Sequence, residues 1–293
     1  MKDCIQRATT SEIRAFAAIT TNLTEEARNR HNCFPVATAA LGRTLTAAVL
    51  LAATLKTKEA ITLKILGDGP VGDIVADAYA NGQVRGYIKN GLVDLPLKNG
   101  KLDVAEAVGQ GQISLTRFTT LKHPFTGTSK LVSGEIAEDV THYLAVSEQT
   151  PSCVALGVLV NPDDTVAAAG GFLVEALPNA SEETISLLEK NLASINSVSE
   201  LISTGHSTKD ILDLVLKGFE INYYPDTDTF FKCQCSRERI LEMLITLGKQ
   251  ELEEMILDGQ AEIICQFCNE KYNVTKTELQ EILNIILSKQ TET

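Results

Sequence analysis

The sequence has no tryptophan, and aromatic residues make up only 5% of its 293 residues. Its net charge is −12, and the acidity is concentrated: residues 1–178 have a net charge of −2, whereas residues 179–293 have a net charge of −10. Proteins that bind nucleic acid need a basic face to displace the counterions of phosphate, and many stack bases on aromatic side chains. Neither feature is present, so we expect no nucleic-acid partner.

Long apolar runs are also missing. The longest, residues 47–53, is far too short to cross a bilayer, so no membrane partner is expected. Residues 1–7 contain no apolar run of the kind that a signal peptide needs. Seven cysteines is an odd number, and four of them look metal-bound, which suits a reducing compartment better than a disulfide scaffold. We therefore expect a cytoplasmic protein.

Catalytic signatures are missing as well. There is no GxSxG or Walker A motif, and none of the four histidines lies in an HExxH motif or beside a cysteine pair in sequence: His31, His123, His142 and His206. Residues 67–72 match GxGxxG, but a dinucleotide fingerprint must open a helix. Here the following run ends at Asn81 and Gly82, which is a hairpin signal. Three cysteines stand alone and are interpreted as small buried side chains: Cys4, Cys33 and Cys153. We therefore predict that the chain is not an enzyme.

Two cysteine pairs form the most specific pattern in the sequence. Cys233 and Cys235 form a CxC motif, Cys265 and Cys268 form a CxxC motif, and the segment 236–264 separates the two motifs. Two tight pairs of thiols are what a closed tetrahedral zinc site needs, because zinc favours four thiolates at ~2.3 Å. The pattern predicts one zinc ion bound by these four residues. An iron–sulfur cluster and four unrelated buried thiols are the less favoured interpretations.

The same four thiolates are also candidates for oxidation. Zinc-bound sulfur is deprotonated, and the thiolate is the form that peroxide attacks. In the CxC motif the two sulfurs lie close enough to cross-link to each other, though in a small and strained ring. The site can therefore stabilise the folded module, and it can also act as an oxidation sensor. The spacing of the cysteines alone does not choose between these roles.

Hydrophobic patterning predicts an α+β protein in three parts. Residues 1–178 read as an N-terminal domain with a mostly antiparallel sheet and packed helices, including a polar helix over 22–32 opened by a capping box at Asn22 and a buried apolar helix over 35–56. Residues 179–231 read as a linker of short amphipathic helices that are only locally stable, followed by an irregular polar stretch over 222–229. Residues 232–293 read as a small metal-binding module with two helices, a hairpin around the CxxC motif and a last helix opened by a capping box at Thr275 and Glu278. A module of this size rarely has a hydrophobic core large enough to fold without a bound metal ion or another cross-link.

The chain resembles the thirty-three-kilodalton chaperonin family, whose members are redox-regulated heat-shock chaperones. The resemblance covers the whole chain and rests on four segments: PVATAALGRT at 35–44, GDGPVG at 67–72, FKCQCSRER at 231–239 and ICQFCN at 264–269. All four cysteine positions match the family's pattern.

The resemblance implies a mechanism. In the reduced state Cys233, Cys235, Cys265 and Cys268 hold one zinc ion, and the chaperone is inactive. Oxidants convert them to the disulfides Cys233–Cys235 and Cys265–Cys268 and zinc leaves. The module and the linker then unfold, and the protein dimerises and holds unfolding client proteins without ATP. Its N-terminal domain and linker are expected to provide the client surface.

Two alternatives stay open at this point. A thiol–disulfide oxidoreductase would use the CxxC motif but needs a thioredoxin-like βαβ context, whereas Cys265 is expected in a small hairpin. A constitutive zinc-stapled adaptor would keep its zinc in peroxide.

Overall fold

The chain divides into two units in the computed structural model, Met1–Lys232 and Cys233–Thr293. The structure describes residues 2–56, 58–119 and 123–291. Residues 1, 57, 120–122 and 292–293, which fall within the predicted domain ranges, lie outside the described residues. The division into three parts at 178 and 231 stays a prediction.

Helix α2 (Pro35–Ala52) is the central element of the first unit. Pro35 occupies the first turn, where its ring fixes φ at a helical value. Its missing N–H has no effect there, because the first N–H groups of a helix have no partner within the helix. Every residue of α2 except Pro35 and Arg43 is buried, because the helix contacts strands of both large sheets. The helix has the length and hydropathy of a membrane span, yet 89% of it is buried inside the protein, as in a core helix. It ends one turn earlier than the predicted residue 56.

The first large sheet has the strand order β10-β1-β2-β9-β8, and β11 also pairs with β1. All of its pairings are antiparallel. Its strands are β1 (Cys4–Thr9), β2 (Ile13–Ile19), β8 (Ser152–Val160), β9 (Val166–Ala176), β10 (Asn222–Tyr223) and β11 (Thr227–Asp228). The last two are short strands in a segment predicted to be irregular, because pairing with β1 supplies order that local sequence does not.

The second large sheet has the order β12-β5-β4-β3-β6-β7, and only β12 pairs in parallel. Its strands are β3 (Ala60–Gly67), β4 (Ile74–Tyr79), β5 (Gln83–Ile88), β6 (Gly111–Phe118), β7 (Phe125–Lys130) and β12 (Phe230–Phe231). The GxGxxG segment leads into strand β4 and not into a helix, and β4 and β5 form the predicted hairpin at Gly82. The segment is therefore a turn between strands and not a dinucleotide fingerprint.

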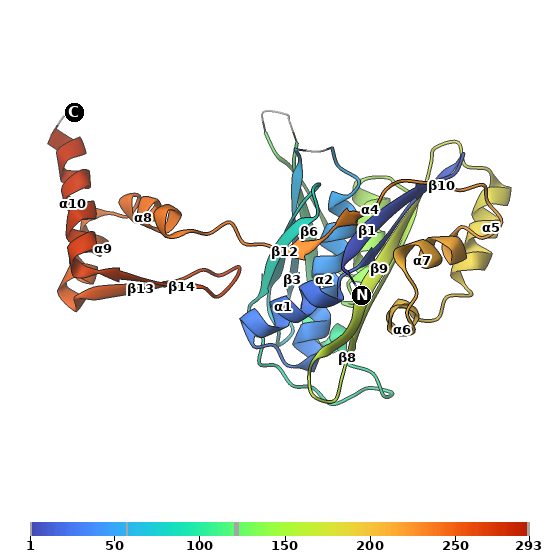
Figure 1. Ribbon diagram of the computed structural model, residues 1–293, viewed down its shortest axis with the longest axis horizontal. Coiled ribbons are helices and arrows are strands. Elements are labelled where there is room, and N and C mark those ends of the chain that lie inside the picture. The colour runs from blue at the N-terminus through green and yellow to red at the C-terminus, as the bar shows by residue number, and fades with distance from the viewer. Residues whose placement is uncertain (1, 57, 120–122, 292–293) are drawn as a thin grey trace. The chain divides into compact units, whose positions relative to one another are not determined.

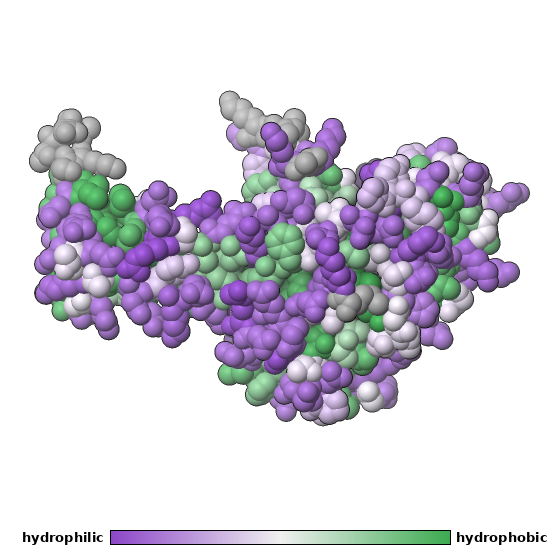
Figure 2. Space-filling model, in the orientation of Figure 1, coloured by the Kyte–Doolittle hydropathy of each residue, from purple (hydrophilic) through white to green (hydrophobic). Residues whose placement is uncertain are grey.

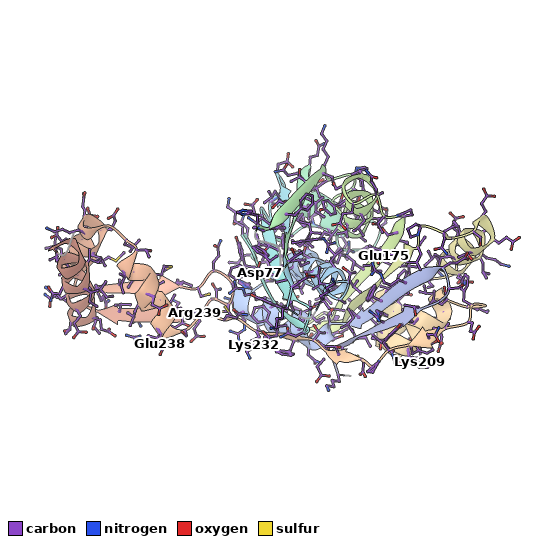
Figure 3. All side chains as sticks on the ribbon, turned by 90° about the horizontal axis from the view of Figure 1, so that it is seen from above. Asp77, Glu175, Lys209, Lys232, Glu238 and Arg239 are labelled. Atoms are coloured by element: carbon purple, nitrogen blue, oxygen red, sulfur yellow. The ribbon has the colours of Figure 1, made fainter. Side chains whose placement is uncertain are left out.

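Three further helices complete the packing around the sheets: α1 (Thr21–His31), α3 (Val104–Val108) and α4 (Ala137–Ser147). The predicted capping box at Asn22 is wrong, because helix α1 begins at Thr21 and a remote side chain caps it. The carboxylate of Asp3 accepts hydrogen bonds from the backbone N–H groups of Asn22 at 3.1 Å and Leu23 at 2.7 Å. Ion pairs tie neighbouring strands together, as Glu175 with Arg14 and Asp77 with Arg85 show; both acidic residues are labelled in Figure 3.

Three short helices follow β9: α5 (Glu182–Leu192), α6 (Val198–Ser203) and α7 (Thr208–Val215). Each begins at a serine whose hydroxyl accepts a backbone N–H, namely Ser181, Ser197 and Ser207. Figure 1 shows these helices on one face of the first sheet. Their apolar side chains form a buried cluster with that sheet, which includes Leu188, Ile202, Leu212 and Val215 from the helices and Phe172 from β9. These helices therefore cover an apolar sheet face.

The second unit contains α8 (Arg237–Ile245), α9 (Lys249–Asp258), the hairpin of β13 (Gln260–Ile264) and β14 (Lys271–Thr275), and α10 (Lys276–Thr291). Its buried cluster consists of five apolar side chains: Leu244, Leu252, Val274, Leu279 and Ile282. The predicted capping box of α10 is present, since Thr275 and Glu278 exchange hydrogen bonds. The α+β fold class with mostly antiparallel sheets is confirmed.

Candidate metal centre and its family

The CxxC pair lies in the loop of the β13–β14 hairpin. The last paired residues of the hairpin are Ile264 and Lys271, and the N–H of Cys265 donates to the carbonyl of Glu270 at 2.9 Å. The chain turns back because Asn269, at φ 58°, adopts the left-handed conformation that asparagine tolerates and donates its N–H to the carbonyl of Cys265 at 2.8 Å. The turn thereby presents both sulfur atoms on one side of the loop.

The CxC pair immediately precedes helix α8. Ser236 is the N-cap of that helix and accepts a hydrogen bond from the backbone N–H of Arg239. The Arg239 guanidinium in turn donates to the carbonyl of Gln234 at 2.7 Å, between the two cysteines. In Figure 3 Arg239 and Glu238 mark this first turn of α8. The helix start therefore fixes the backbone that carries the pair.

The four sulfur atoms meet in one group and all lie within 4.8 Å of one another. Sulfur atoms of the two motifs approach each other: Cys233 and Cys265 are 3.7 Å apart, and Cys235 and Cys268 are 3.3 Å apart. Four thiolates around zinc at ~2.3 Å would be separated by about 3.8 Å, the edge of the tetrahedron. Both the donor set and the spacing fit a four-thiolate metal site.

Backbone N–H groups point at the sulfur atoms and favour their charged form. The N–H of Cys235 donates to Cys233, the N–H of Phe267 to Cys265, and the N–H of Glu270 to Cys268. Burial raises the pKa of the Cys233 thiol, but this N–H and the neighbouring thiols outweigh burial and lower the pKa to about 7. Burial raises the pKa of Cys265 and of Cys268. A bound cation would hold all four as thiolates.

A tyrosine that the sequence did not single out completes the site. The hydroxyl of Tyr272 in β14 donates to the sulfur of Cys235 at 3.1 Å, across the group from its own hairpin. Hydrogen bonds of this kind orient metal ligands and tune their reactivity. No spacing rule identifies this residue, because the contact depends on how the two motifs come together in space.

The other sequence candidates lie elsewhere. Cys4 and Cys33 are buried as predicted, whereas Cys153 is only half-buried. Burial raises the pKa values of the Cys4 and Cys153 thiols, and raises that of Cys33 to about 12, so these three thiols stay protonated near neutral pH. His31 contacts the carbonyl of Gly86, and His206 contacts that of Leu201. Within the described residues, the only group of at least three metal-ligating side chains is the four-cysteine group.

The comparisons with known proteins identify the family. A family model described as "Hsp33 protein" matches residues 3–275 of this chain. The chain belongs to the Hsp33 family. The resemblance found in the four sequence segments is therefore confirmed, and the chain is a member of a chaperone family.

Curated relatives and a solved structure agree with this membership. The chain is 49% identical over 293 residues to the 33 kDa chaperonin of Desulforamulus reducens, covering 99% of this chain and 100% of that protein. It is 50% identical over 274 residues to the 33 kDa chaperonin of Bacillus licheniformis, covering 92% of this chain and 94% of that protein. The crystal structure of the 33 kDa chaperonin from Thermotoga maritima matches with a TM-score of 0.91 and 38% identity, covering 98% of this chain and 100% of that one.

The site geometry bears on one alternative. A thioredoxin-like oxidoreductase carries its CxxC motif in a βαβ context. Here Cys265 and Cys268 lie in the loop of a two-stranded antiparallel hairpin. The hairpin of this chain therefore does not supply the setting that this alternative requires.

Proposed function

We propose that this protein is a redox-regulated, ATP-independent chaperone that binds unfolding proteins and prevents their aggregation. In the reduced state Cys233, Cys235, Cys265 and Cys268 bind one zinc ion and the chaperone is inactive. Oxidation of these residues activates it. The observation that carries the proposal is the meeting of all four sulfur atoms within 4.8 Å, in a unit with few buried apolar side chains.

The second unit needs the metal to stay folded. A cluster of five buried apolar side chains, with nine partly buried ones packed against it, provides little hydrophobic stabilisation for about 60 residues. Zinc, when bound, supplies folding free energy of order 10 kcal/mol or more, because the unfolded chain has no preformed site. The four cysteines join the start of α8 to the hairpin loop, so losing the metal separates these two parts of the unit.

Oxidation removes the ligands in pairs. Two molecules of peroxide take four electrons from the four thiolates, which form two disulfides, while four protons are taken up and four molecules of water leave. We propose the pairs Cys233–Cys235 and Cys265–Cys268. Disulfides are poor zinc ligands, so zinc is released with this step.

Unfolding then exposes apolar surface. Helices α5, α6 and α7 have only 11, 6 and 8 residues, which is too short for stability in isolation. They depend on packing against the first sheet, where they cover buried side chains such as Ala15, Ala17 and Phe172. Figure 2 shows a visible surface that is mainly hydrophilic and broken by separate apolar patches. Loosening of these helices would uncover a continuous apolar sheet face for clients.

The same proposal specifies partners and setting. Clients are unfolded proteins, the oxidised form is a homodimer, and no nucleic-acid, membrane or enzymatic role is proposed. The cytoplasm is the proposed location, because its reducing conditions keep the four thiols available for zinc.

Light scattering tests the proposal. A chemically unfolded client is diluted into buffer containing the reduced zinc-loaded protein, the protein after peroxide at mild heat, or the oxidised protein reduced again with zinc present. The proposal predicts that only the oxidised sample suppresses aggregation and that the third sample behaves like the first. Equal suppression by all samples would show a constitutive chaperone, and no suppression by any would overturn the proposal.

A further inference from the structure

Residues 222–232, which we call the strap, follow helix α7 after residues 216–221 and lead directly to Cys233. The strap contributes the three shortest strands of the two large sheets, β10, β11 and β12. β10 and β11 pair with β1, and β12 pairs with β5. Within the described strands, β1 and β5 would be the outermost strands of their sheets without it. One segment thus covers one edge of each sheet.

The strap is held by short strand pairings and by a few backbone hydrogen bonds beyond them. Its N–H groups donate from Tyr224 to Arg7 at 2.9 Å, from Thr229 to Asp3 at 3.3 Å, from Phe230 to Gly82 at 3.2 Å and from Lys232 to Val84 at 2.8 Å. Each of its strands pairs over two residues, whereas β1 pairs with β2 over six. Local opening therefore requires less free energy at the strap than within either sheet.

The side chains of the strap show what chemistry these edges accept. The Arg7 guanidinium lies 3.7 Å from the centre of the Tyr224 ring, and that of Arg30 lies 5.2 Å from the Phe231 ring. The Lys2 ammonium pairs with Asp228 at 2.6 Å. The edges thus bind an extended segment that combines aromatic and acidic residues.

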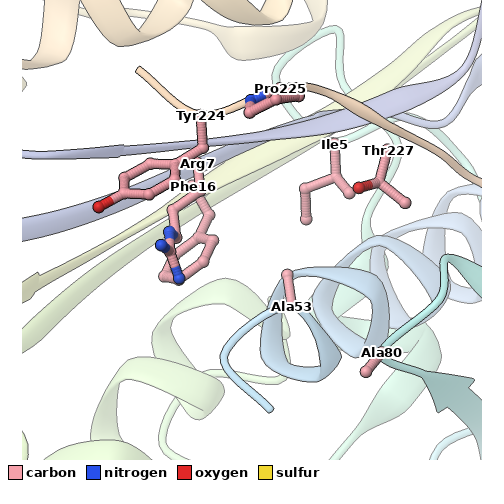
Figure 4. A pocket seen from close by; sticks show the side chains of 8 residues that line it. All are labelled: Ile5, Arg7, Phe16, Ala53, Ala80, Tyr224, Pro225 and Thr227. Carbon is pink, nitrogen blue, oxygen red and sulfur yellow. The ribbon is translucent and has the colours of Figure 1, made fainter. Parts of the chain in front are cut away.

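A pocket lies beneath the strap. It has a volume of about 180 Å³ and is shown in Figure 4. Tyr224, Pro225 and Thr227 of the strap form one wall, and the rest of the lining comes from Ile5, Arg7, Phe16, Ala53 and Ala80. When the strap leaves, this pocket opens next to the free edge of β1. Strand-adding peptides are recognised by this combination of free backbone groups and side-chain pockets.

Gly82 marks how closely the strap approaches the second sheet. A Cβ atom at this position would lie 2.0 Å from the carbonyl oxygen of Asp228, and the residue has φ 85°. The hydroxyl of Thr229, which is buried, donates to the Gly82 carbonyl at 2.8 Å. The edge of β5 is therefore shaped to receive a backbone at close range.

We propose that the edges of β1 and β5 are client-binding sites, which the strap occupies until oxidation frees them. This inference rests on the proposed function, since the strap continues directly into Cys233 and the proposed oxidation of that residue is the event that frees it. The occupant of the freed edges is an extended, aromatic-containing segment of an unfolded client. It binds by strand addition, with its backbone replacing that of the strap and a side chain entering the pocket.

A peptide with the sequence of residues 222–232 tests the edges directly. The labelled peptide is titrated against the full chain, oxidised or reduced and zinc-loaded, and binding is followed by fluorescence anisotropy. We expect binding at least about tenfold tighter to the oxidised chain. Methylation of the peptide nitrogens of Tyr224, Phe230 and Lys232 removes three donors and should weaken binding at least about tenfold. Equal binding of the methylated peptide would overturn strand addition, whatever the light-scattering result shows about the proposed function.

Hydrogen exchange with an unfolded client tests the same surface in the working protein. Oxidation should deprotect the amides of the strap, and adding client should protect β1 and β5 while the strap stays exposed. If the oxidised chain suppresses aggregation but these edges gain no protection from client, the proposed function stands and the edge assignment fails. Protection that appears without client and rises with protein concentration would assign the edges to a second copy and overturn the client assignment.

A substitution in the strap separates its pairing from the redox step. Phe230→Pro removes the N–H that donates to Gly82, whereas Phe230→Ala keeps it and serves as the matched control. We expect the reduced, zinc-loaded Phe230→Pro chain to bind the peptide at least about threefold more tightly than the Phe230→Ala chain. Equal binding by these two variants, with normal zinc content in both, would contradict the role of the strap as a cover.

Discussion

The two units of this chain use cysteine in opposite ways. In the first unit Cys4, Cys33 and Cys153 are separate from one another in sequence, and burial raises their pKa values. In the second unit four cysteines meet within 4.8 Å, and backbone N–H groups point at their sulfur atoms. The comparison teaches that the surroundings of a cysteine, and not the residue type alone, determine the pKa of its thiol. Cys4 and Cys33 belong to the core of the first unit, whereas the four grouped cysteines of the second unit could hold a metal ion.

The same contrast holds for what keeps each unit folded. The first unit surrounds the buried helix α2 with two six-stranded sheets, whereas the second has a cluster of five buried apolar residues. Burial of apolar surface supports the first, and under the proposed function a metal ion stabilises the second. Under the proposed function, oxidation of the four thiolates unfolds the second unit, whereas in the first unit it loosens only α5, α6, α7 and the strap.

The largest effect is expected from removing one ligand. Cys268→Ser should abolish stoichiometric zinc binding and unfold residues 233–293, a loss of order 10 kcal/mol for that unit. Zinc content and hydrogen exchange measure the two consequences. The matched control is Cys153→Ser, which should keep zinc; normal zinc content in the Cys268→Ser chain would contradict the four-ligand site.

A substitution in the core of the first unit should leave the second unit unaffected. Leu45 in α2 is fully buried, so Leu45→Ala should reduce the free energy of unfolding of the first unit by about 2–5 kcal/mol. Zinc content should not change. Leu252→Ala is the counterpart in the second unit and should weaken zinc binding, because folding and binding are coupled there. Denaturant unfolding and zinc titration measure the two effects. A zinc affinity unchanged by Leu252→Ala would contradict the coupling of folding and zinc binding in the second unit.

The raised pKa of the buried Cys33 thiol should be detectable as a pH dependence of stability under alkaline conditions. Burial raises the pKa of Cys33 from 9.0 to about 12, so between these values the unfolded chain loses a proton that the folded chain keeps. The stabilisation is fully present below pH 9 and is lost as the pH rises towards 12, by up to about 1.4 kcal/mol per pH unit. Denaturant unfolding of the Cys33→Ala chain between pH 8 and pH 11 should show a correspondingly smaller loss. An unchanged slope would mean that Cys33 is not protected by burial.

The smallest effect is expected at Tyr272. Its hydroxyl donates to Cys235, which withdraws electron density from that thiolate. Tyr272→Phe should therefore accelerate zinc release by peroxide a few-fold while leaving zinc stoichiometry unchanged. A zinc-sensitive dye follows the release, and Tyr79→Phe in the first unit provides the control. Slower release would show that the hydroxyl assists oxidation instead of restraining it.

A structural feature could be predicted from the sequence where the residues that form it lie close together in the chain. The four-cysteine pattern was recognised because each pair is held by a turn of a few residues, and the capping box at Thr275 and Glu278 was predicted for the same reason. The cap of α1 by Asp3 and the hydrogen bond from Tyr272 were not predicted, because partners 19 and 37 residues apart meet only in the folded chain. β10 and β11 were missed because pairing with β1, which lies near the N-terminus, gives polar residues a strand conformation.

The central claim is that the same four thiolates hold the second unit together and keep the chaperone inactive. The most direct measurement records zinc release and suppression of client aggregation in one sample while peroxide is added in steps. We predict that suppression rises in proportion to released zinc and reaches its maximum when zinc loss is complete. Complete release of zinc with no gain in suppression, or full suppression before any zinc is released, would contradict it.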